Sequence, residues 1–244
     1  MNTRKMAAGL LLLLLSAAAT AATDDELNLI NAAGKGDLRI FKMMLEMGAN
    51  PDVADKGGNS AILLAAYHER RDMVKRLIEL GVDVNRKGSL GYTPLGAAAM
   101  HDDEKIAAML IAAAANLNAR DDVGGTPLLN AIRYERNEIV GALLNAGADP
   151  DKSGSNGDTP LKLAAQMGRL DYTDLLLAKG ARTWNAPDAL YCALFEGHDE
   201  VATRLVEAGA DVRNLVNGYP PLHWARVMDR QKMVQLLVKA GAVE

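Results

Sequence analysis

A short tripeptide returns at a fixed interval along this chain. Thr93-Pro94-Leu95 recurs at residues 126–128 and 159–161, each copy 33 residues after the last, and a degenerate copy, Ser60-Ala61-Ile62, lies 33 residues earlier. A second mark, a pair of small residues, keeps step with it at Gly48-Ala49, Gly81-Val82, Ala114-Ala115, Gly147-Ala148, Gly180-Ala181, Gly209-Ala210 and Gly241-Ala242. Self-similarity at such a spacing is typical of a stacked repeat array. The sequence therefore predicts seven copies of one unit, the last at 218–244.

The first mark predicts a helix start. A threonine hydroxyl can cap the free amide groups there, and a following proline gives up only a donor that has no partner. We expect this helix to be short and to end near an alanine pair such as Ala65-Ala66, whose small side chains let neighbouring helices approach. A second helix follows, with its apolar positions on one face. In the second copy these positions are Met73, Val74, Leu77 and Ile78.

The second mark predicts the end of that second helix. Glycine accepts the left-handed conformation that terminates a helix. Ala114 replaces this glycine in the third copy. We expect it to cost about 1 kcal/mol if the same geometry is kept, because a Cβ atom is crowded there.

Turn sequences connect the copies. Asp-Lys-Gly-Gly at 55–58 and Asn-Gly at 156–157 and 217–218 are suited to projecting hairpins. Two helices, a hairpin, 33 residues and the pattern Thr-Pro-Leu-His-x-Ala together resemble the ankyrin repeat family, and the best copy of that pattern is 221–225, Pro-Leu-His-Trp-Ala. The resemblance covers 24–244 and implies an all-α repeat solenoid of about seven stacked helix-turn-helix repeats with short β-hairpin loops.

The fifth connection departs from this pattern. Ten steps separate Gly180 from Leu190, where other repeats use fourteen, so we expect a cropped loop. The favoured expectation is that Trp184 fills the space of the missing loop, because large aromatic side chains are more often packed than exposed. The alternative is a notch that binds a ligand, formed by Trp184, Tyr191 and Cys192.

The first 22 residues have the order of a secretory signal peptide. Arg4 and Lys5 precede an apolar run at 6–19, and small residues follow it. We expect cleavage after Ala21 or Ala22, a periplasmic mature domain at 23–244, and no stable membrane insertion after cleavage. An uncleaved N-terminal anchor is the alternative. No cysteine follows the run, which disfavours a lipoprotein.

Charge and cysteine content argue against nucleic-acid binding, an internal disulfide and a reactive thiol. Without Arg4 and Lys5 the chain has 25 basic and 31 acidic residues, a net charge of −6. Such a surface has no electrostatic footprint for nucleic acid. The single cysteine, Cys192, allows no internal disulfide, and its place in the repeat predicts a buried, inert thiol.

Histidines and carboxylates give no reactive set. His198 and His223 occupy positions where the repeat pattern carries histidine, which predicts structural hydrogen bonds. His68 and His101 occupy equivalent places in adjacent repeats. Packed helices lie roughly 8 to 10 Å apart, too far for two nitrogens that must each be about 2 Å from one zinc ion. Acidic runs fall at expected helix starts or loops. We expect no enzyme activity, metal or cofactor.

The resemblance implies that the loop tips and the polar ends of the first helices line a concave, partner-binding side. Five of the ten aromatic residues fall on these positions, and tyrosine and arginine are common interface anchors. Together with Glu196, the predicted protein-binding residues are Tyr67, His68, Tyr92, Met100, His101, Arg133, Tyr134, Gln166, Met167, Phe195 and Tyr219.

The sequence thus favours an exported, monomeric module that binds another extracytoplasmic protein. Two roles resemble those of exported bacterial relatives: support of an oxidative-stress enzyme, or inhibition of a toxin or cell-wall hydrolase by an immunity protein. Rivals from other classes are a small-ligand binder or enzyme at the notch near Trp184, and a structural filament module.

Overall fold

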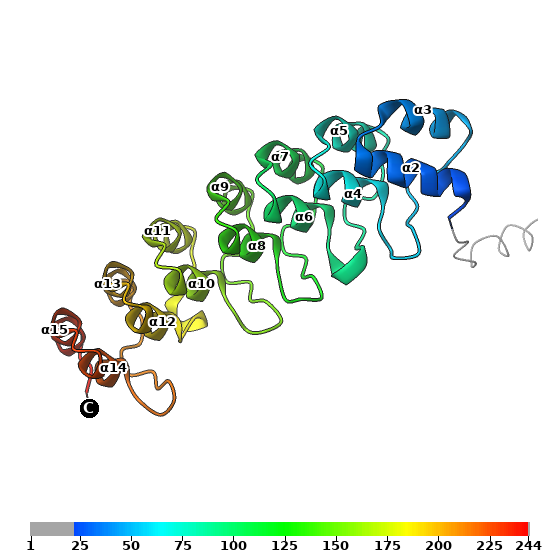
Figure 1. Ribbon diagram of the computed structural model, residues 1–244. Helices are drawn as coiled ribbons and strands as arrows, with labels where there is room; N and C mark the ends of the chain where they lie inside the picture. The colour runs from blue at the N-terminus through cyan, green and yellow to red at the C-terminus, as the bar shows by residue number, and fades with distance from the viewer. Residues whose placement is uncertain (1–21, 244) are drawn as a thin grey trace, which may run out of the picture.

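The computed structural model describes residues 22–243, so all but the last residue of the expected signal sequence at 1–22 lies outside the described residues. Helices alternate between two rows (Figure 1). The inner row consists of α2 (Asp24–Lys35), α4 (Ala61–Tyr67), α6 (Pro94–Met100), α8 (Pro127–Arg133), α10 (Pro160–Gln166), α12 (Ala189–Glu196) and α14 (Pro221–Val227). The outer row consists of α3 (Leu38–Glu46), α5 (Arg71–Glu79), α7 (Glu104–Ala112), α9 (Asn137–Asn145), α11 (Leu170–Ala178), α13 (Asp199–Glu207) and α15 (Gln231–Lys239).

Figure 1 shows the helix pairs stacked one after another into an elongated array, with the loops projecting on the side of the inner row. The predicted all-α repeat solenoid is confirmed. The loops contain less strand pairing than the predicted hairpins. In the described residues they form only isolated bridges, between Ala54 and Ser60 and between Val216 and Tyr219. In the loop at 121–125 the Asp121 carboxylate accepts hydrogen bonds from the backbone N–H groups of Val123 and Gly125, which stabilises a tight turn.

The inner helices begin where the sequence predicts. Ser60, Thr93, Thr126 and Thr159 each accept a hydrogen bond from the backbone N–H three residues later, at 3.1 to 3.3 Å. Proline occupies the first helical position after each threonine. These caps satisfy amide groups that a helix leaves without an internal partner, so each Thr-Pro fixes where its repeat starts.

The core runs continuously between the two rows. Each outer helix from α5 to α15 places one fully buried leucine, at 0% exposure, in the same repeat position: Leu77, Leu110, Leu143, Leu176, Leu205 and Leu237. Alanines of the inner helices, such as Ala98 and Ala99, are equally buried and let successive pairs approach. Because each pair shares its apolar side with the next, a single pair cannot bury that side alone.

The residue that ends each outer helix adopts the left-handed conformation. Its φ is +90° at Gly48, +94° at Gly147 and +60° at Ala114. The sequence-based expectation for Ala114 is therefore confirmed, and this alanine carries backbone strain that its glycine counterparts avoid.

We expect Ala114→Gly to raise the free energy of unfolding by about 1 kcal/mol, because it removes the crowded Cβ atom. Gly147→Ala is the matched reverse change and should lower it by a similar amount. A Cβ added at Gly147 would meet no atom within 4 Å, so backbone strain alone is tested. Urea denaturation of both variants measures the effect. An unchanged or lower midpoint for Ala114→Gly would contradict it.

A ladder of polar contacts joins consecutive repeats on the turn side, where each inner helix passes into its outer helix. Arg70 and Arg136 donate to the carbonyl oxygens of Gly34 and Met100, each at 3.2 Å from Nε. His198 places Nε2 3.2 Å from the Gln166 carbonyl, the structural role predicted for it. These groups meet carbonyls that the end of a helix leaves without a partner, and so favour the stacked arrangement.

A tighter contact joins the fourth and fifth repeats. The Arg169 guanidinium lies over the ring of buried Tyr172, 3.9 Å from its centroid, and pairs with Asp171 and Glu135. Hydrogen bonding to Asp171, opposed by burial, raises the pKa of Arg169, and the same bond lowers the pKa of Asp171. The Tyr172 hydroxyl donates to Asn137 of the preceding repeat. The contact therefore combines a buried ring with paired charges.

Candidate functional site

The inner face is the surface formed by the exposed sides of the inner helices and by the loops beside them. Five aromatic side chains in the chain are exposed, and all lie on this face, at 42% to 71% of full exposure: Tyr67, Tyr134, Trp184, Phe195 and Tyr219. Tyr92, Tyr191 and Trp224 lie on it half-buried. The other two aromatic residues, Phe41 and Tyr172, are buried in outer helices. Aromatic side chains are thus segregated to one face.

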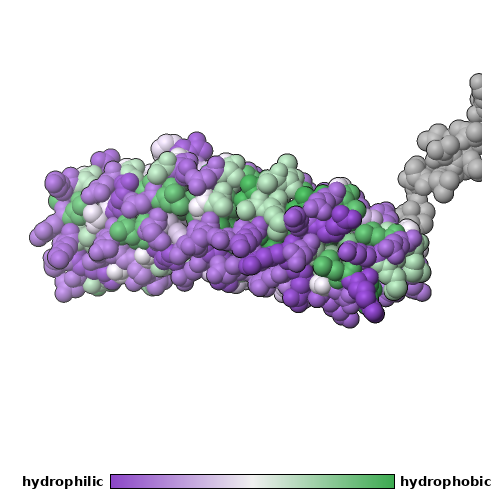
Figure 2. Space-filling view, turned by 90° about the horizontal axis from the view of Figure 1, so that it is seen from above, coloured by the Kyte–Doolittle hydropathy of each residue, from purple (hydrophilic) through white to green (hydrophobic). Residues whose placement is uncertain are grey.

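The outer face differs. Figure 2 views the array from the side of the outer row and shows a largely hydrophilic surface with scattered hydrophobic patches. Between α5 and α13, Leu80 is the single large hydrophobic residue of the outer row that is exposed. The remaining exposed ones of this row lie in the first and last repeats. A mixed, polar surface of this kind is typical of solvent contact.

Three of the predicted residues form a tyrosine cluster: Tyr67 from α4, Tyr92 before α6 and Tyr134 after α8. Burial raises the pKa of Tyr92, and Asp121, followed by Tyr134 and Tyr67, adds to this effect, so both tyrosines lie within electrostatic range of Tyr92. Tyr67 also packs edge-on against His101, with ring centroids 4.8 Å apart, and against His68 at 5.2 Å. Repeats two to four thus contribute to one surface.

An apolar pocket of about 280 Å³ opens beside the tyrosine cluster. It is lined by Asn59, Leu63, Leu64, Tyr67, His68, Ser89, Leu90 and Tyr92. Leu90 is 59% exposed and has a φ of +57°, a strained value for a leucine. Strained, exposed backbone of this kind is concentrated at binding sites. The pocket is below the usual size of small-ligand sites and suits one or two apolar side chains.

A second group, the aromatic cluster, lies in the last two repeats and consists of Tyr191, Phe195, Tyr219, His223 and Trp224. Tyr219 stacks on His223 with ring centroids 4.1 Å apart. Trp224 stands edge-on to Tyr191, Tyr219 and His223 at 5.3 to 5.8 Å. The sequence predicted a hydrogen-bonding role for His223; instead, ring contacts hold it, and among residues 22–243 no hydrogen bond to its side chain is present.

Trp184 does not fill the space of the missing loop, so the favoured expectation for it was wrong. Its side chain is 71% exposed on a short 3₁₀ turn, Thr183–Asn185. The neighbours on both sides face inward instead: the Thr183 hydroxyl donates to the Gly209 carbonyl at 3.2 Å, and Asn185 donates to Asp151 at 2.8 Å. With both flanking side chains anchored, the indole between them points outward.

The remaining predicted residues are divided between and beside the clusters. The positive charge of Arg133 acts to lower the pKa of Tyr92, against the stronger effect of burial. The Met100 carbonyl accepts hydrogen bonds from the Arg136 guanidinium. Gln166 and Met167 end α10, between the two clusters, and join neither. The sequence reasoning missed Trp224 and Val227, and placed Tyr191 only in the alternative notch. The repeat period could have found Val227, which occupies the position of Phe195 and is 64% exposed.

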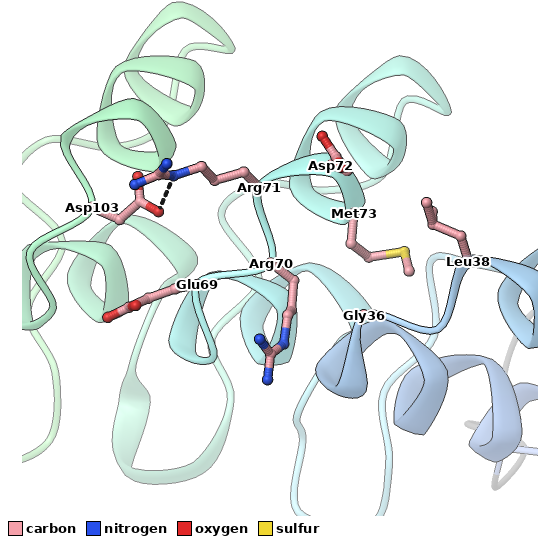
Figure 3. Close-up of a pocket in the computed structure, with 8 residues that line it drawn as sticks. All are labelled: Gly36, Leu38, Glu69, Arg70, Arg71, Asp72, Met73 and Asp103. Atoms are coloured by element: carbon pink, nitrogen blue, oxygen red, sulfur yellow. Dashed lines mark hydrogen bonds and ion pairs between the residues drawn. The ribbon is translucent and has the colours of Figure 1, made fainter.

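A larger cavity lies elsewhere, on the turn side. It measures about 420 Å³ and is lined by Gly36, Leu38, Glu69, Arg70, Arg71, Asp72, Met73 and Asp103 (Figure 3). A similar groove of about 330 Å³ recurs at the turns of repeats five and six. Figure 3 shows Arg71 reaching across to Asp103, at 2.6 Å, while Arg70 lies beside the end of α2. The groove results from stacking, and across it Arg71 is paired with Asp103 while Arg70 donates to the Gly34 carbonyl.

Reactive groups are sparse over residues 22–243. No group of three or more His, Cys, Asp or Glu residues in this part is arranged to hold a metal ion, and none of its helices has the length and apolar character to cross a membrane. Cys192 is half-buried, and burial raises the pKa of its thiol. A raised pKa keeps the thiol protonated and weakly reactive.

Comparison with known families agrees with the fold. The family model of ankyrin repeats (3 copies) matches residues 29–121, 114–186 and 181–243. A comparison with curated proteins gave no match. Ankyrin repeats generally mediate protein–protein interaction and are typically non-enzymatic binding scaffolds. From its repeat period, its stacked helix pairs and these matches, the chain belongs to the ankyrin repeat family.

Proposed function

We propose that this protein is an exported, periplasmic module that acts as a monomer and captures another protein on its inner face. One observation carries the proposal: every exposed aromatic side chain of the chain lies on that face. Exposed tyrosine, tryptophan and phenylalanine supply large contact areas at low entropic cost and dominate the binding energy of many interfaces. Placement on one face is what a single partner requires.

Export is supported by the order of the first 22 residues, with basic residues, an apolar run and small residues in succession. The mature chain would then meet its partner outside the cytoplasm. Support of an oxidative-stress enzyme is the role we favour, and inhibition of a toxin or cell-wall hydrolase is the alternative. The identity of the captured protein decides between them.

The ligand-binding or enzymatic notch near Trp184 receives no support from the geometry. An indole that is 71% exposed does not line an enclosed cavity, and water-excluding cavities are what small-ligand sites and reactive centres generally need. We therefore propose a binding role for Trp184 only as part of the inner face.

Capture by the immobilised mature chain, residues 23–244, from its own extracytoplasmic extract tests the proposal. We expect Tyr67→Ala with Tyr134→Ala, and separately Phe195→Ala with Tyr219→Ala, to reduce the captured partner at least about tenfold, because each pair removes exposed aromatic anchors. Leu80→Ala on the outer face is the control and should leave capture unchanged. Equal capture by wild type and both double variants would contradict an inner-face site.

A further inference from the structure

Helix α12 presents two adjacent columns of side chains on the inner face. Tyr191 and Phe195 are four residues apart and form the first, with ring centroids at 5.6 Å. Asp188, Cys192 and Glu196 follow the same spacing and form the second, since residues four apart share a face of a helix. Burial chiefly raises the pKa of Cys192, and the carboxylates of Asp188 and Glu196 add to it, which places both near this column. Rings and carboxylates therefore lie side by side.

Neither of these two carboxylates forms an ion pair in the described part of the chain, although Lys162 lies within electrostatic range of Asp188. Among residues 22–243, no lysine or arginine lies within ion-pair distance of Asp188 or Glu196. The nearby Asp158 differs, because Lys162 neutralises it at 3.0 Å. The local excess is negative, in a mature chain whose net charge is −6. An approaching positive charge is favoured at this point of the inner face.

The rings beside these carboxylates present suitable surfaces. Phe195 is 51% and Tyr219 49% exposed, while Tyr191, His223 and Trp224 are half-buried beneath them. Aromatic faces attract cations, and arginine both stacks on rings and pairs with carboxylates. The chain itself uses this combination elsewhere, where Arg169 covers the Tyr172 ring at 3.9 Å and pairs with Asp171 at 2.7 Å.

The tyrosine cluster does not offer the same combination. Glu69 lies 3.5 Å from the His101 ring nitrogen Nδ1, and Asp121 accepts bonds within its own loop. Its pocket is apolar. A cationic segment is therefore favoured at repeats six and seven, and an apolar side chain at repeats two to four.

We propose that the aromatic cluster, with Asp188 and Glu196 at its edge, binds an arginine side chain from a basic segment of the partner protein. This inference rests on the proposed protein-binding function and specifies the partner's chemistry at one place. The guanidinium would stack on the exposed rings while its N–H groups donate to the nearer carboxylate, since residues eight apart in a helix are about 12 Å from one another along its axis.

Intrinsic fluorescence tests this directly. The chain has two tryptophans, so Trp184→Phe leaves Trp224 as the single reporter, within the cluster. The probe is the peptide acetyl-Gly-Arg-Ala-Arg-Gly-amide, titrated against the mature chain. Its citrulline analogue is neutral and nearly the same shape, and acetyl-Gly-Glu-Ala-Glu-Gly-amide is acidic. We expect saturable binding of the arginine peptide, at least about tenfold weaker binding of the citrulline peptide, and none of the acidic one.

Substitutions locate the site. Asp188→Asn with Glu196→Gln, and separately Phe195→Ala, should each weaken the arginine peptide about tenfold, while Tyr67→Ala should leave it unchanged. These side chains are at least partly exposed, so folding is expected to survive. Equal binding of the arginine and citrulline peptides, stronger binding of the acidic peptide, or insensitivity to both substitutions would overturn the inference.

The two proposals fail separately. If partner capture depends on Phe195 and Tyr219 but the arginine peptide does not bind, this inference is wrong and the proposed function stands. If the arginine peptide binds as expected but no inner-face substitution changes partner capture, the arginine site at the aromatic cluster stands and the proposed function is wrong.

Discussion

Tyr172→Ala lowers the free energy of unfolding by about 4 kcal/mol, the largest effect we expect from any single substitution discussed for this chain. The ring is 2% exposed between the fourth and fifth repeats, and the Arg169 guanidinium lies over it at 3.9 Å. Truncation leaves a cavity and removes the surface on which Arg169 rests. Because neighbouring repeats stabilise one another through their shared surfaces, the loss weakens the whole array.

Tyr172→Phe is the matched control. It keeps the ring and removes only the hydroxyl that donates to Asn137, so it should cost about 1 kcal/mol. Urea denaturation of the mature chain, followed by circular dichroism, separates the two effects. Similar losses for both variants would show that the hydroxyl, and not the packed ring, holds this junction together.

Asp103→Ala should lower the free energy of unfolding by about 2 kcal/mol. The Asp103 side chain is 3% exposed and begins α7, where it accepts from the backbone N–H groups of Lys105 and Ile106, both at 3.1 Å. It also accepts from Arg71 Nε of the preceding repeat at 2.6 Å. That partner is largely in solvent, so most of the effect comes from the lost cap.

Asp103→Asn distinguishes the cap from the charge. Asparagine caps a helix nearly as well as aspartate, so this variant should retain most of the stability and lose only the ion pair to Arg71. Thermal denaturation of both variants beside wild type provides the comparison. A loss for Asp103→Asn as large as that for Asp103→Ala would assign the stability to the cross-repeat pair instead.

The repeat period predicts nearly all of the fold. Thr93 and its counterparts start helices, and Ala114 occupies the left-handed place of a glycine, because both effects are local and recur in every copy. The loops were harder. Asp55 and Asp121 cap their turns in the same way, yet in the described residues a bridge forms across the Asp55 loop and none across the Asp121 loop, so the turn residues alone do not reveal which loops pair.

The candidate site was predicted less completely. Tyr67 and Tyr134 hold adjacent places two repeats apart, and Tyr92 precedes the inner helix that lies between theirs, so stacking places all three on one face. Trp224 was missed, and Tyr191 was considered only for the alternative notch, because positions in the middle of an inner helix are usually buried. Trp184 was misplaced because hydrogen bonds of Thr183 and Asn185 to distant residues, absent from any local pattern, decide its orientation.

Helix α10 separates the tyrosine cluster from the aromatic cluster along one body. A ligand long enough to reach both would bind with avidity, because engaging the first holds the rest of the molecule at high local concentration near the second. Such tethering can strengthen overall affinity by about 10² to 10⁴ without any further contact. Isolated fragments of the partner would then associate far more weakly than the intact molecule.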